Sequence, residues 1–295
     1  MFEGFERRLI DVGATALHCR IGGDGPPLLL LHGFPQTHVM WHGLAAPLAE
    51  RFTVVAVDLK GYGDSAKPAG GPPHAVYAKR TLAGECRRLM AALGFARFAV
   101  AAHDRGARVA HRLALDHPSV VERLALLDIV ATRTLFDATD RALAMAYEHW
   151  FFLAQPAPFP ETMIEAAPIA YLHAKLGGWG TGLAAFAPAA LAEYERCIQD
   201  PATIHAMCED YRAAATIDLE HDRADAAARI RCPLLVLWGA HGVMHRHFDV
   251  LATWRELHAE PASVQGRAIA AGHFLAEKSP DATLAALAPF LAGSR

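Results

Sequence analysis

The sequence has no excess of positive charge and no apolar run long enough to span a bilayer. Its 28 Lys and Arg residues stand against 31 Asp and Glu residues, which gives a formal net charge of −3. The opening stretch MFEGFERRLIDVG mixes both signs of charge and lacks the long apolar core of a signal peptide. We therefore expect no nucleic-acid partner and no association with membranes.

Cysteine is scarce, and its spacing disfavours cross-linking. The chain of 295 residues contains five cysteines, and none of them forms a C-x-x-C pair. They are Cys19, Cys86, Cys197, Cys208 and Cys232. An odd, scattered set of this kind disfavours a disulfide framework and a structural zinc site. We expect a cytoplasmic protein in a reducing compartment, without a metal or another cofactor.

Short apolar runs, however, alternate regularly with longer helix-like stretches. Five nearly continuous apolar runs are typical of buried strands: 26–34, 52–59, 98–104, 123–129 and 232–239. Helical patterns lie between them, for example at 77–93 and 105–117. This alternation predicts right-handed βαβ units and a mostly parallel, doubly wound α/β sheet. In such folds the active site lies beyond the carboxyl ends of the strands.

The alternation breaks in the middle of the chain. The segment 133–222 is rich in Ala, Pro and aromatic residues and reads as helical, without a clear strand. We interpret it as an inserted helical cap over the strand ends, with 1–132 and 223–295 forming the core. The alternative is a set of ordinary crossover helices within the sheet domain.

The segment AAHDRGAR, residues 101–108, resembles a tight turn between a strand and a helix. Ala102 and Gly106 flank Asp104 at two-residue spacing, which is the small-x-nucleophile-x-small pattern of a nucleophile elbow. Such a turn places the central side chain at the top of the sheet, against the first N–H groups of a helix. The alternative is an aspartate that only caps the helix.

Three other segments favour the elbow. HGFP, residues 32–35, follows a strand, and the backbone N–H groups of Phe34 and Arg105 can form an oxyanion hole there. His273 in AGHFLAEKSPD is placed late in the chain, as expected for the histidine of a nucleophile–acid–histidine order. Asp128 ends the strand after the elbow helix and can orient that histidine.

A carboxylate at the elbow points to reaction at a saturated carbon. A serine that attacks such a carbon gives an ether, whereas Asp104 gives an ester, which water can hydrolyse. Asp104 is already ionised, so the task of His273 is to activate the water. Alkyl halides and epoxides are the two substrate types that fit.

Two arginines and several aromatic residues favour a halogenated acid. Arg105 and Arg108 lie three residues apart on one helix face and can hold a substrate carboxylate. The alternative is a solvated or structurally paired role for the two arginines. In the predicted cap, His149, Trp150 and Tyr211 carry N–H or O–H donors that can surround a departing halide, although each can also be a packing residue.

These motifs resemble the α/β-hydrolase family, whose D-x-x-G-x-G-x-S loop is similar to DLKGYGDSAKP at 58–68. The segments HDRGAR, LLDI, YEHWFF, HAKLGGWG, CEDYRA and GHFLAE closely resemble the haloacetate dehalogenases, in particular the fluoroacetate dehalogenase group. The resemblance extends from HGFPQT to GHFLAEKSPD and includes the cap. It implies hydrolysis of a small 2-haloacetate to glycolate and halide, and it implies a homodimer.

The resemblance also implies a role for each matching residue. Asp104 is similar to the nucleophile, Asp128 to the acid and His273 to the base; Arg105 and Arg108 resemble the carboxylate clamp; His149, Trp150 and Tyr211 resemble the halide site; Trp179 resembles a pocket wall; and Phe34 and Arg105 supply the oxyanion N–H groups.

Other readings remain open at this point. Epoxide hydrolases usually place the acid after the later strand, here 232–239, and the first carboxylate after that run is Asp249. They also use a pair of cap tyrosines, and the tyrosines available here are Tyr147, Tyr171, Tyr194 and Tyr211. A dehalogenase that releases chloride or bromide but not fluoride also fits, since the sequence does not rank halides. A ligand-binding protein on a hydrolase fold is a third reading, against which the intact Asp–His–Asp set speaks.

Two further motifs carry no site. Gly61 and Gly63 lack the full G-x-G-x-x-G pattern and a later acidic partner, so we expect no nucleotide site. The loop HGVMHRH carries His241, His245 and His247, but no carboxylate or cysteine ligand pattern accompanies them, so we expect no metal there.

Overall fold

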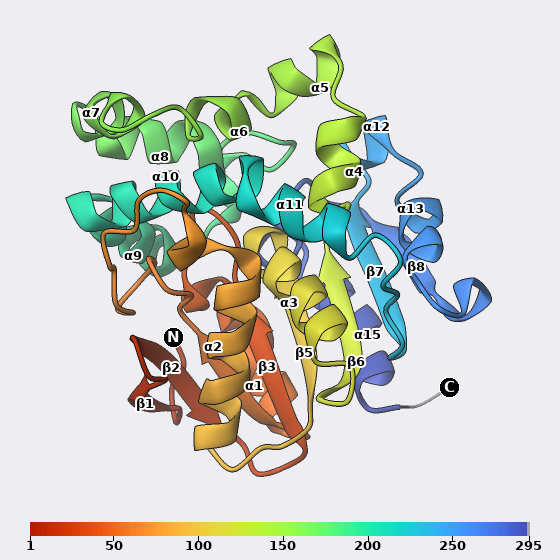
Figure 1. Ribbon diagram of the computed structural model, residues 1–295. Helices are drawn as coiled ribbons and strands as arrows, with labels where there is room; N and C mark the ends of the chain where they lie inside the picture. The colour runs from red at the N-terminus through yellow and green to blue at the C-terminus, as the bar shows by residue number, and fades with distance from the viewer. Residues whose placement is uncertain (294–295) are drawn as a thin grey trace.

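A single eight-stranded sheet forms the centre of the computed structural model, which describes residues 1–293 (Figure 1). Its strands are β1 (Glu6–Asp11), β2 (Ala16–Gly22), β3 (Pro27–Leu31), β4 (Thr53–Val57), β5 (Phe98–His103), β6 (Val121–Leu127), β7 (Leu234–Gly239) and β8 (Gln265–Ile269). They lie in the order β1-β2-β4-β3-β5-β6-β7-β8. The strands from β3 to β8 are parallel, and β2 runs antiparallel to both β1 and β4. The predicted mostly parallel α/β sheet is confirmed.

The sequence prediction missed the two N-terminal strands. β1 has the sequence ERRLID, and all its side chains except Ile10 are exposed. This strand lies at the edge of the sheet and pairs only with β2, so it needs no continuous apolar run. A search for buried parallel strands therefore does not find it.

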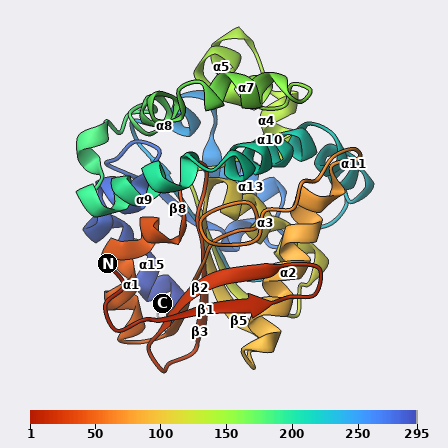
Figure 2. The same ribbon diagram turned by 90° about the vertical axis from the view of Figure 1, so that its left-hand side faces the viewer.

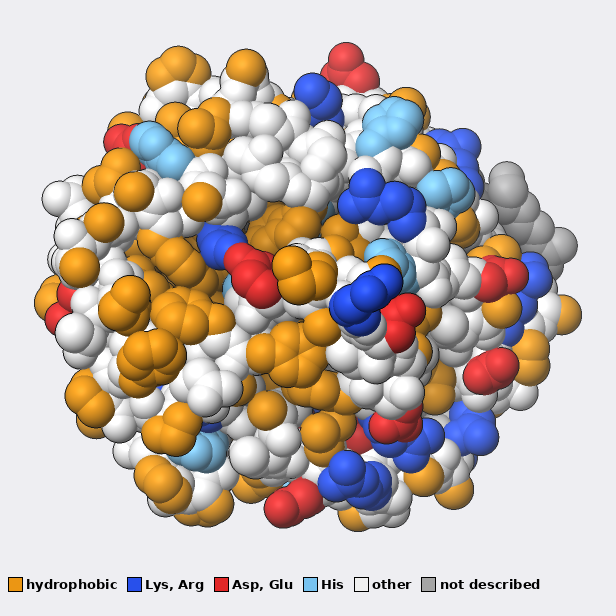
Figure 3. Space-filling view, turned by 90° about the horizontal axis from the view of Figure 1, so that it is seen from above, with side chains coloured by type: hydrophobic (Ala, Val, Ile, Leu, Met, Phe, Trp, Pro, Cys, Tyr) orange, Lys and Arg blue, Asp and Glu red, His pale blue; other side chains and the backbone are white. Residues whose placement is uncertain are grey.

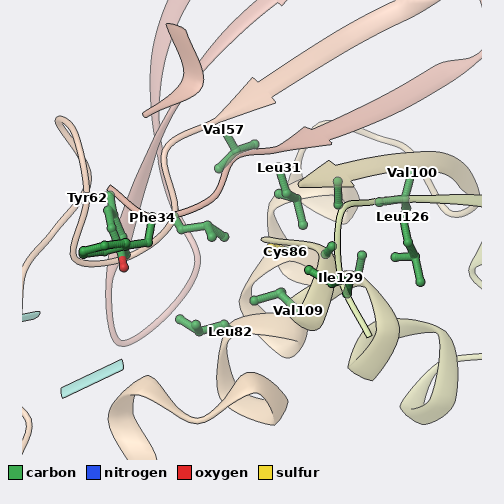
Figure 4. Close-up of a cluster of buried hydrophobic side chains, with 14 of the residues drawn as sticks. Leu31, Phe34, Val57, Tyr62, Leu82, Cys86, Val100, Val109, Leu126 and Ile129 are labelled. Atoms are coloured by element: carbon green, nitrogen blue, oxygen red, sulfur yellow. The ribbon is translucent and has the colours of Figure 1, made fainter. Parts of the chain in front are cut away.

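Helices cover both faces of the sheet. Outside the stretch between β6 and β7 they are α1 (His42–Ala49), α2 (Lys79–Ala92), α3 (Asp104–Asp116), α12 (Val243–His247), α13 (Val250–Glu256), α14 (Leu275–Lys278) and α15 (Pro280–Leu291). Leu29 and Leu31 of β3 belong to an apolar cluster with α2 and α3, part of which is drawn in Figure 4. Leu28 and Leu30 belong to a second cluster with α1 and α15. Strands that are buried on both faces explain the unbroken apolar runs.

The chain between β6 and β7 is helical in every regular element that the structure describes. Its α-helices are α4 (Thr132–Asp137), α5 (Arg141–Ala146), α6 (Glu148–Phe152), α7 (Phe159–Glu165), α8 (Pro168–Leu176), α9 (Pro188–Ile198), α10 (Pro201–Ala215) and α11 (Ile217–Ala224). Figures 1 and 2 show α5–α10 as a layer across one end of the sheet. The predicted cap boundaries fall inside α4 and α11 and stay a prediction.

Among residues 1–293, no helix combines the length and the apolar character needed to cross a bilayer.

Candidate active site

Asp104 stands at a sharp turn between β5 and α3. Its φ angle is +43°, in the left-handed region that non-glycine residues rarely adopt. A Cβ atom on Gly106 would lie 2.3 Å from the His32 carbonyl oxygen, and one on Gly33 would lie 2.5 Å from the Cβ of Asp104. Both positions therefore need glycine, because the turn brings the two loops into contact around this carboxylate.

One predicted oxyanion donor already contacts Asp104. The Phe34 backbone N–H donates a hydrogen bond of 3.0 Å to Oδ2 of Asp104. In the described part of the chain no second backbone N–H donates to this carboxylate, and the Arg105 N–H has no such bond. The Oδ1 atom therefore has no backbone donor in this arrangement.

Asp128 and His273 form a short hydrogen bond. Nδ1 of His273 lies 2.6 Å from Oδ2 of Asp128, and the Gly239 N–H donates to the other carboxylate oxygen at 2.8 Å. The backbone N–H of His273 donates to the Trp179 carbonyl at 3.0 Å. Asp249, the next carboxylate along the chain after β7, instead caps α13 through the Ala252 N–H.

The charges in the site keep Asp104 ionised and His273 basic. Burial alone would raise the pKa of Asp104, but the nearby positive charges of His273, Arg105 and Arg108 outweigh it and lower the pKa. Burial alone would lower the pKa of His273, but the hydrogen bond to Asp128 and the charges of Asp128 and Asp104 raise it. At neutral pH Asp104 is an anion.

Arg105 and Arg108 are both buried, and each keeps an N–H without a partner. Arg108 donates through Nη1 to the Val130 carbonyl at 2.8 Å and to Oγ1 of Thr132 at 3.2 Å, while its Nε has no acceptor. Nη1 of Arg105 is likewise buried without an acceptor. Burial and the neighbouring Arg105 lower the pKa of Arg108 to about 10, which leaves it charged at neutral pH. Unpaired buried donors of this kind are costly, so they point to an absent acceptor.

Aromatic side chains from the helices between β6 and β7 close the site. The His149 ring stacks on Phe34 with centroids 5.6 Å apart and meets Tyr211 edge-on at 5.5 Å. Trp150 lies against the Arg108 guanidinium at 4.5 Å. The Tyr211 hydroxyl is buried without a hydrogen-bond partner, whereas Nδ1 of His149 lies 3.5 Å from the Glu148 carboxylate. Burial lowers the pKa of His149 to about 4, so the ring is neutral at neutral pH.

The remaining predicted residues are Trp179 and the four tyrosines of the cap. The indole N–H of Trp179 donates to the Ala146 carbonyl at 3.0 Å, and the Trp179 ring lies edge-on to His273 with centroids 5.4 Å apart. Trp179 therefore lines the site beside His273, and its N–H is not available to a ligand. Among the tyrosines considered for epoxide opening, the Tyr194 hydroxyl donates to Glu277. The Tyr147 ring lies 5.3 Å from His149, and Tyr171 has a buried hydroxyl without a partner.

Sequence reasoning missed two residues that contact this site. Asp210 accepts hydrogen bonds from the Arg105 side chain, and His103 lies beneath His273. Nε2 of His103 lies 3.0 Å from the His273 carbonyl, and the two rings are 4.6 Å apart. The only signal in the sequence was position, since Asp210 directly precedes Tyr211 and His103 directly precedes Asp104.

The side chains that come close enough to share a metal ion, within residues 1–293, lie elsewhere. Nδ1 of His18 and Nδ1 of His38 lie 2.7 and 2.8 Å from the two carboxylate oxygens of Asp58. Hydrogen bonds thus already join these three buried residues. In α12, which follows β7, Nδ1 of His245 accepts a hydrogen bond from the Trp238 indole N–H at 3.1 Å.

Comparison with known proteins adds a family and several relatives. Residues 26–280 match the model of the alpha/beta hydrolase fold family. A fluoroacetate dehalogenase from Burkholderia sp is 48% identical over 296 residues, covering 100% of this chain and 96% of the relative. A soluble epoxide hydrolase from Corynebacterium sp. (strain C12) is 33% identical, covering 96% of both chains. The crystal structure of ALR0039, assigned as an alpha/beta hydrolase of Nostoc sp PCC 7120, has a TM-score of 0.96 and 54% identity and covers 99% of both chains.

Proposed function

Because the chain belongs to the alpha/beta hydrolase family, we propose from its site that it is a haloacid dehalogenase. It hydrolyses a short 2-haloacid such as a haloacetate to the 2-hydroxy acid, which is glycolate for a haloacetate, and releases halide. Asp104 is the nucleophile, His273 is the base and Asp128 orients the base. The 48% identity to a fluoroacetate dehalogenase over the whole chain supports this proposal.

One observation carries the choice of substrate. Two buried guanidinium groups within the first turns of the elbow helix, Arg105 and Arg108, each keep an N–H without an acceptor. A carboxylate supplies both the missing acceptors and a compensating negative charge. If it binds there, the adjacent α-carbon of the substrate lies beside Asp104, which provides much of the orientation that displacement requires.

In the first step, Oδ1 of Asp104 attacks the halogen-bearing carbon. The new C–O bond forms an aspartyl ester while the C–halogen bond breaks and its electron pair leaves with the halide. The Phe34 N–H holds Oδ2, which becomes the carbonyl oxygen of the ester. We assign the halide to the donors of His149, Trp150 and Tyr211, of which the Tyr211 hydroxyl is buried without another partner.

In the second step, His273 accepts a proton from water, and the resulting hydroxide attacks the ester carbonyl of Asp104. The Phe34 N–H donates to the oxyanion that forms. Collapse of this intermediate breaks the Cγ–Oδ1 bond of Asp104, and Oδ1 leaves as the hydroxyl oxygen of the product with the proton of the new carboxyl group. The oxygen from water remains on Asp104 and restores its carboxylate. Asp128 stabilises the protonated His273 through Nδ1 until the proton returns to solvent.

Epoxide hydrolysis is the second candidate, and the site favours it less. A neutral epoxide would leave the free N–H groups of Arg105 and Arg108 unpaired. The relative with that activity is 33% identical, whereas the dehalogenase is 48% identical.

The direct test is halide release from fluoroacetate and chloroacetate, measured side by side with the wild-type protein. We expect release from chloroacetate and fluoroacetate, with glycolate formed in equal amount. Release from chloroacetate alone would keep the mechanism but show that the halide donors are too loosely placed for fluoride. Release from neither, together with opening of a simple epoxide, would overturn the proposal.

Turnover should fall in acid because His273 must be neutral to accept a proton. Its pKa is raised in the free enzyme, and protonation of the ring removes the base. Asp104 stays ionised there because its own pKa is lowered. Formation of the ester removes the Asp104 charge, so in the second step the pKa of His273 is lower than in the free enzyme. We expect acid to slow steady turnover but not the first halide release, as rapid-quench measurements across pH can show. Equal loss of both would contradict this role.

Three proposals go beyond the single site. Residues 133–222 form a cap over a core of 1–132 and 223–295; α10 of this cap supplies Tyr211.

The protein forms a homodimer. The exposed apolar side chains Met145 on α5 and Phe159 and Met163 on α7 support an interface on the face seen from above in Figure 3, which shows much apolar surface. The five free cysteines support a cytoplasmic location.

A further inference from the structure

A buried carboxylate outside the predicted site fixes the orientation of Arg105. Nε of Arg105 donates to Oδ2 of Asp210 at 2.8 Å, and Nη2 donates to Oδ1 at 3.0 Å and to the Asp210 carbonyl at 2.9 Å. Both side chains are at most 2% exposed. This two-point pairing uses one edge of the planar guanidinium and leaves Nη1 as the nitrogen without an acceptor.

A lysine stands behind Asp210. Nζ of Lys79, on α2, donates to Oδ1 of Asp210, and the Tyr62 hydroxyl donates to Oδ2 at 3.2 Å. Asp218 of α11 accepts from the Lys79 backbone N–H at 2.8 Å, and its Oδ2 lies 3.8 Å from Nζ. Asp210 therefore accepts hydrogen bonds from Lys79 on α2, Arg105 on α3 and Tyr62 in the loop after β4.

We propose that Asp210 is a positioning residue for recognition of the substrate carboxylate, and that Lys79 acts through it. The inference rests on the proposed dehalogenase function. Asp210 holds Arg105 by one edge so that Nη1 faces the substrate, and it keeps the guanidinium from pairing with the nucleophile. Because α10 carries both Asp210 and Tyr211, the same helix places the carboxylate site and one halide donor.

The competition between two carboxylates explains why Asp210 is needed. Burial lowers the pKa of Arg105, but the negative charges of Asp210 and Asp104 raise it. Asp210 also accepts hydrogen bonds from the Arg105 guanidinium. Without Asp210, Asp104 remains as a buried acceptor for this arginine. A guanidinium paired with Asp104 would occupy the oxygen that attacks and the space where the substrate carboxylate binds.

The test compares Asp210→Asn with a matched control, Glu85→Gln. Glu85 on α2 also pairs with a buried lysine, with Nζ of Lys60 at 2.7 Å from Oε1 and both side chains 3% exposed, but it contacts no proposed site residue. Each variant removes a carboxylate that pairs with a buried lysine, so both should lose stability. Acetate, an unreactive carboxylate, is the probe of the binding site, with its Kd measured by calorimetry.

We expect Asp210→Asn to weaken acetate binding and to raise KM for chloroacetate, each by roughly tenfold or more. Glu85→Gln should stay within about twofold in both. Lys79→Met should change both quantities in the same direction by less, and it serves if Asp210→Asn does not fold. The inference would be overturned if Asp210→Asn or Lys79→Met kept the wild-type acetate affinity and KM. It would also be overturned if Glu85→Gln weakened acetate binding and raised KM as much as Asp210→Asn does. Failure of the wild-type protein to release halide would instead overturn the proposed function.

Discussion

Replacement of Asp104 by asparagine should reduce halide release from chloroacetate by about 10⁴-fold or more. An amide oxygen carries no charge and is a poor nucleophile, so the ester cannot form at a useful rate. The geometry around the side chain should survive, because the Phe34 N–H can donate to an amide oxygen as it does to Oδ2. Halide release and intact protein mass should be followed together, since hydrolysis of the new amide would restore aspartate.

The control for this prediction is another aspartate at a helix start. Asp249 is exposed and accepts a hydrogen bond from the Ala252 N–H at the beginning of α13. Asp249→Asn should keep full activity, with a stability change within about 1 kcal/mol. If Asp104→Asn retained turnover while its mass stayed that of the amide, Asp104 would be only a helix-terminal residue.

Replacement of His273 by asparagine should separate the two steps. The first step needs only an ionised Asp104, so one equivalent of halide per site should still appear in a burst. The second step loses its base, and steady turnover should fall by about 10²- to 10⁴-fold. A rapid-quench assay that follows halide and glycolate separately would show halide without a matching amount of product.

A buried histidine outside the site provides the comparison for His273. Nδ1 of His258 accepts a hydrogen bond from the Glu260 backbone N–H at 2.9 Å, and Nε2 lies 2.9 Å from the Cys232 carbonyl oxygen. His258→Asn should lose stability but release halide and glycolate in equal amounts. Loss of the burst itself in His273→Asn would mean that His273 is needed before the ester forms.

Local sequence predicted the elbow and the strand-end acid because their signals lie within a few residues. Ala102 and Gly106 flank Asp104 after an apolar run, and the close approach of Gly106 to the His32 carbonyl explains the need for a small residue. Asp128 follows β6 in the same way, and its position at a strand end was sufficient to place it near His273.

The partners of these residues were not predictable, because they come from distant parts of the chain. Arg105 and Asp210 are 105 positions apart, and only the packing of α10 over α3 brings them together. The same holds for Trp179, whose N–H is used by Ala146 and is therefore not a halide donor. Pattern reasoning names the residue types of a site, whereas tertiary packing decides which donor atoms stay free.

The proposed mechanism requires an ester between the substrate and Asp104. To find it, His273→Asn can be treated with chloroacetate and digested, and mass spectrometry can then show which residue carries the added carboxymethyl group. We expect one group per chain, on the peptide that contains Asp104, lost slowly in water with release of glycolate. An unmodified protein that has released halide, or a modification on another residue, would contradict it.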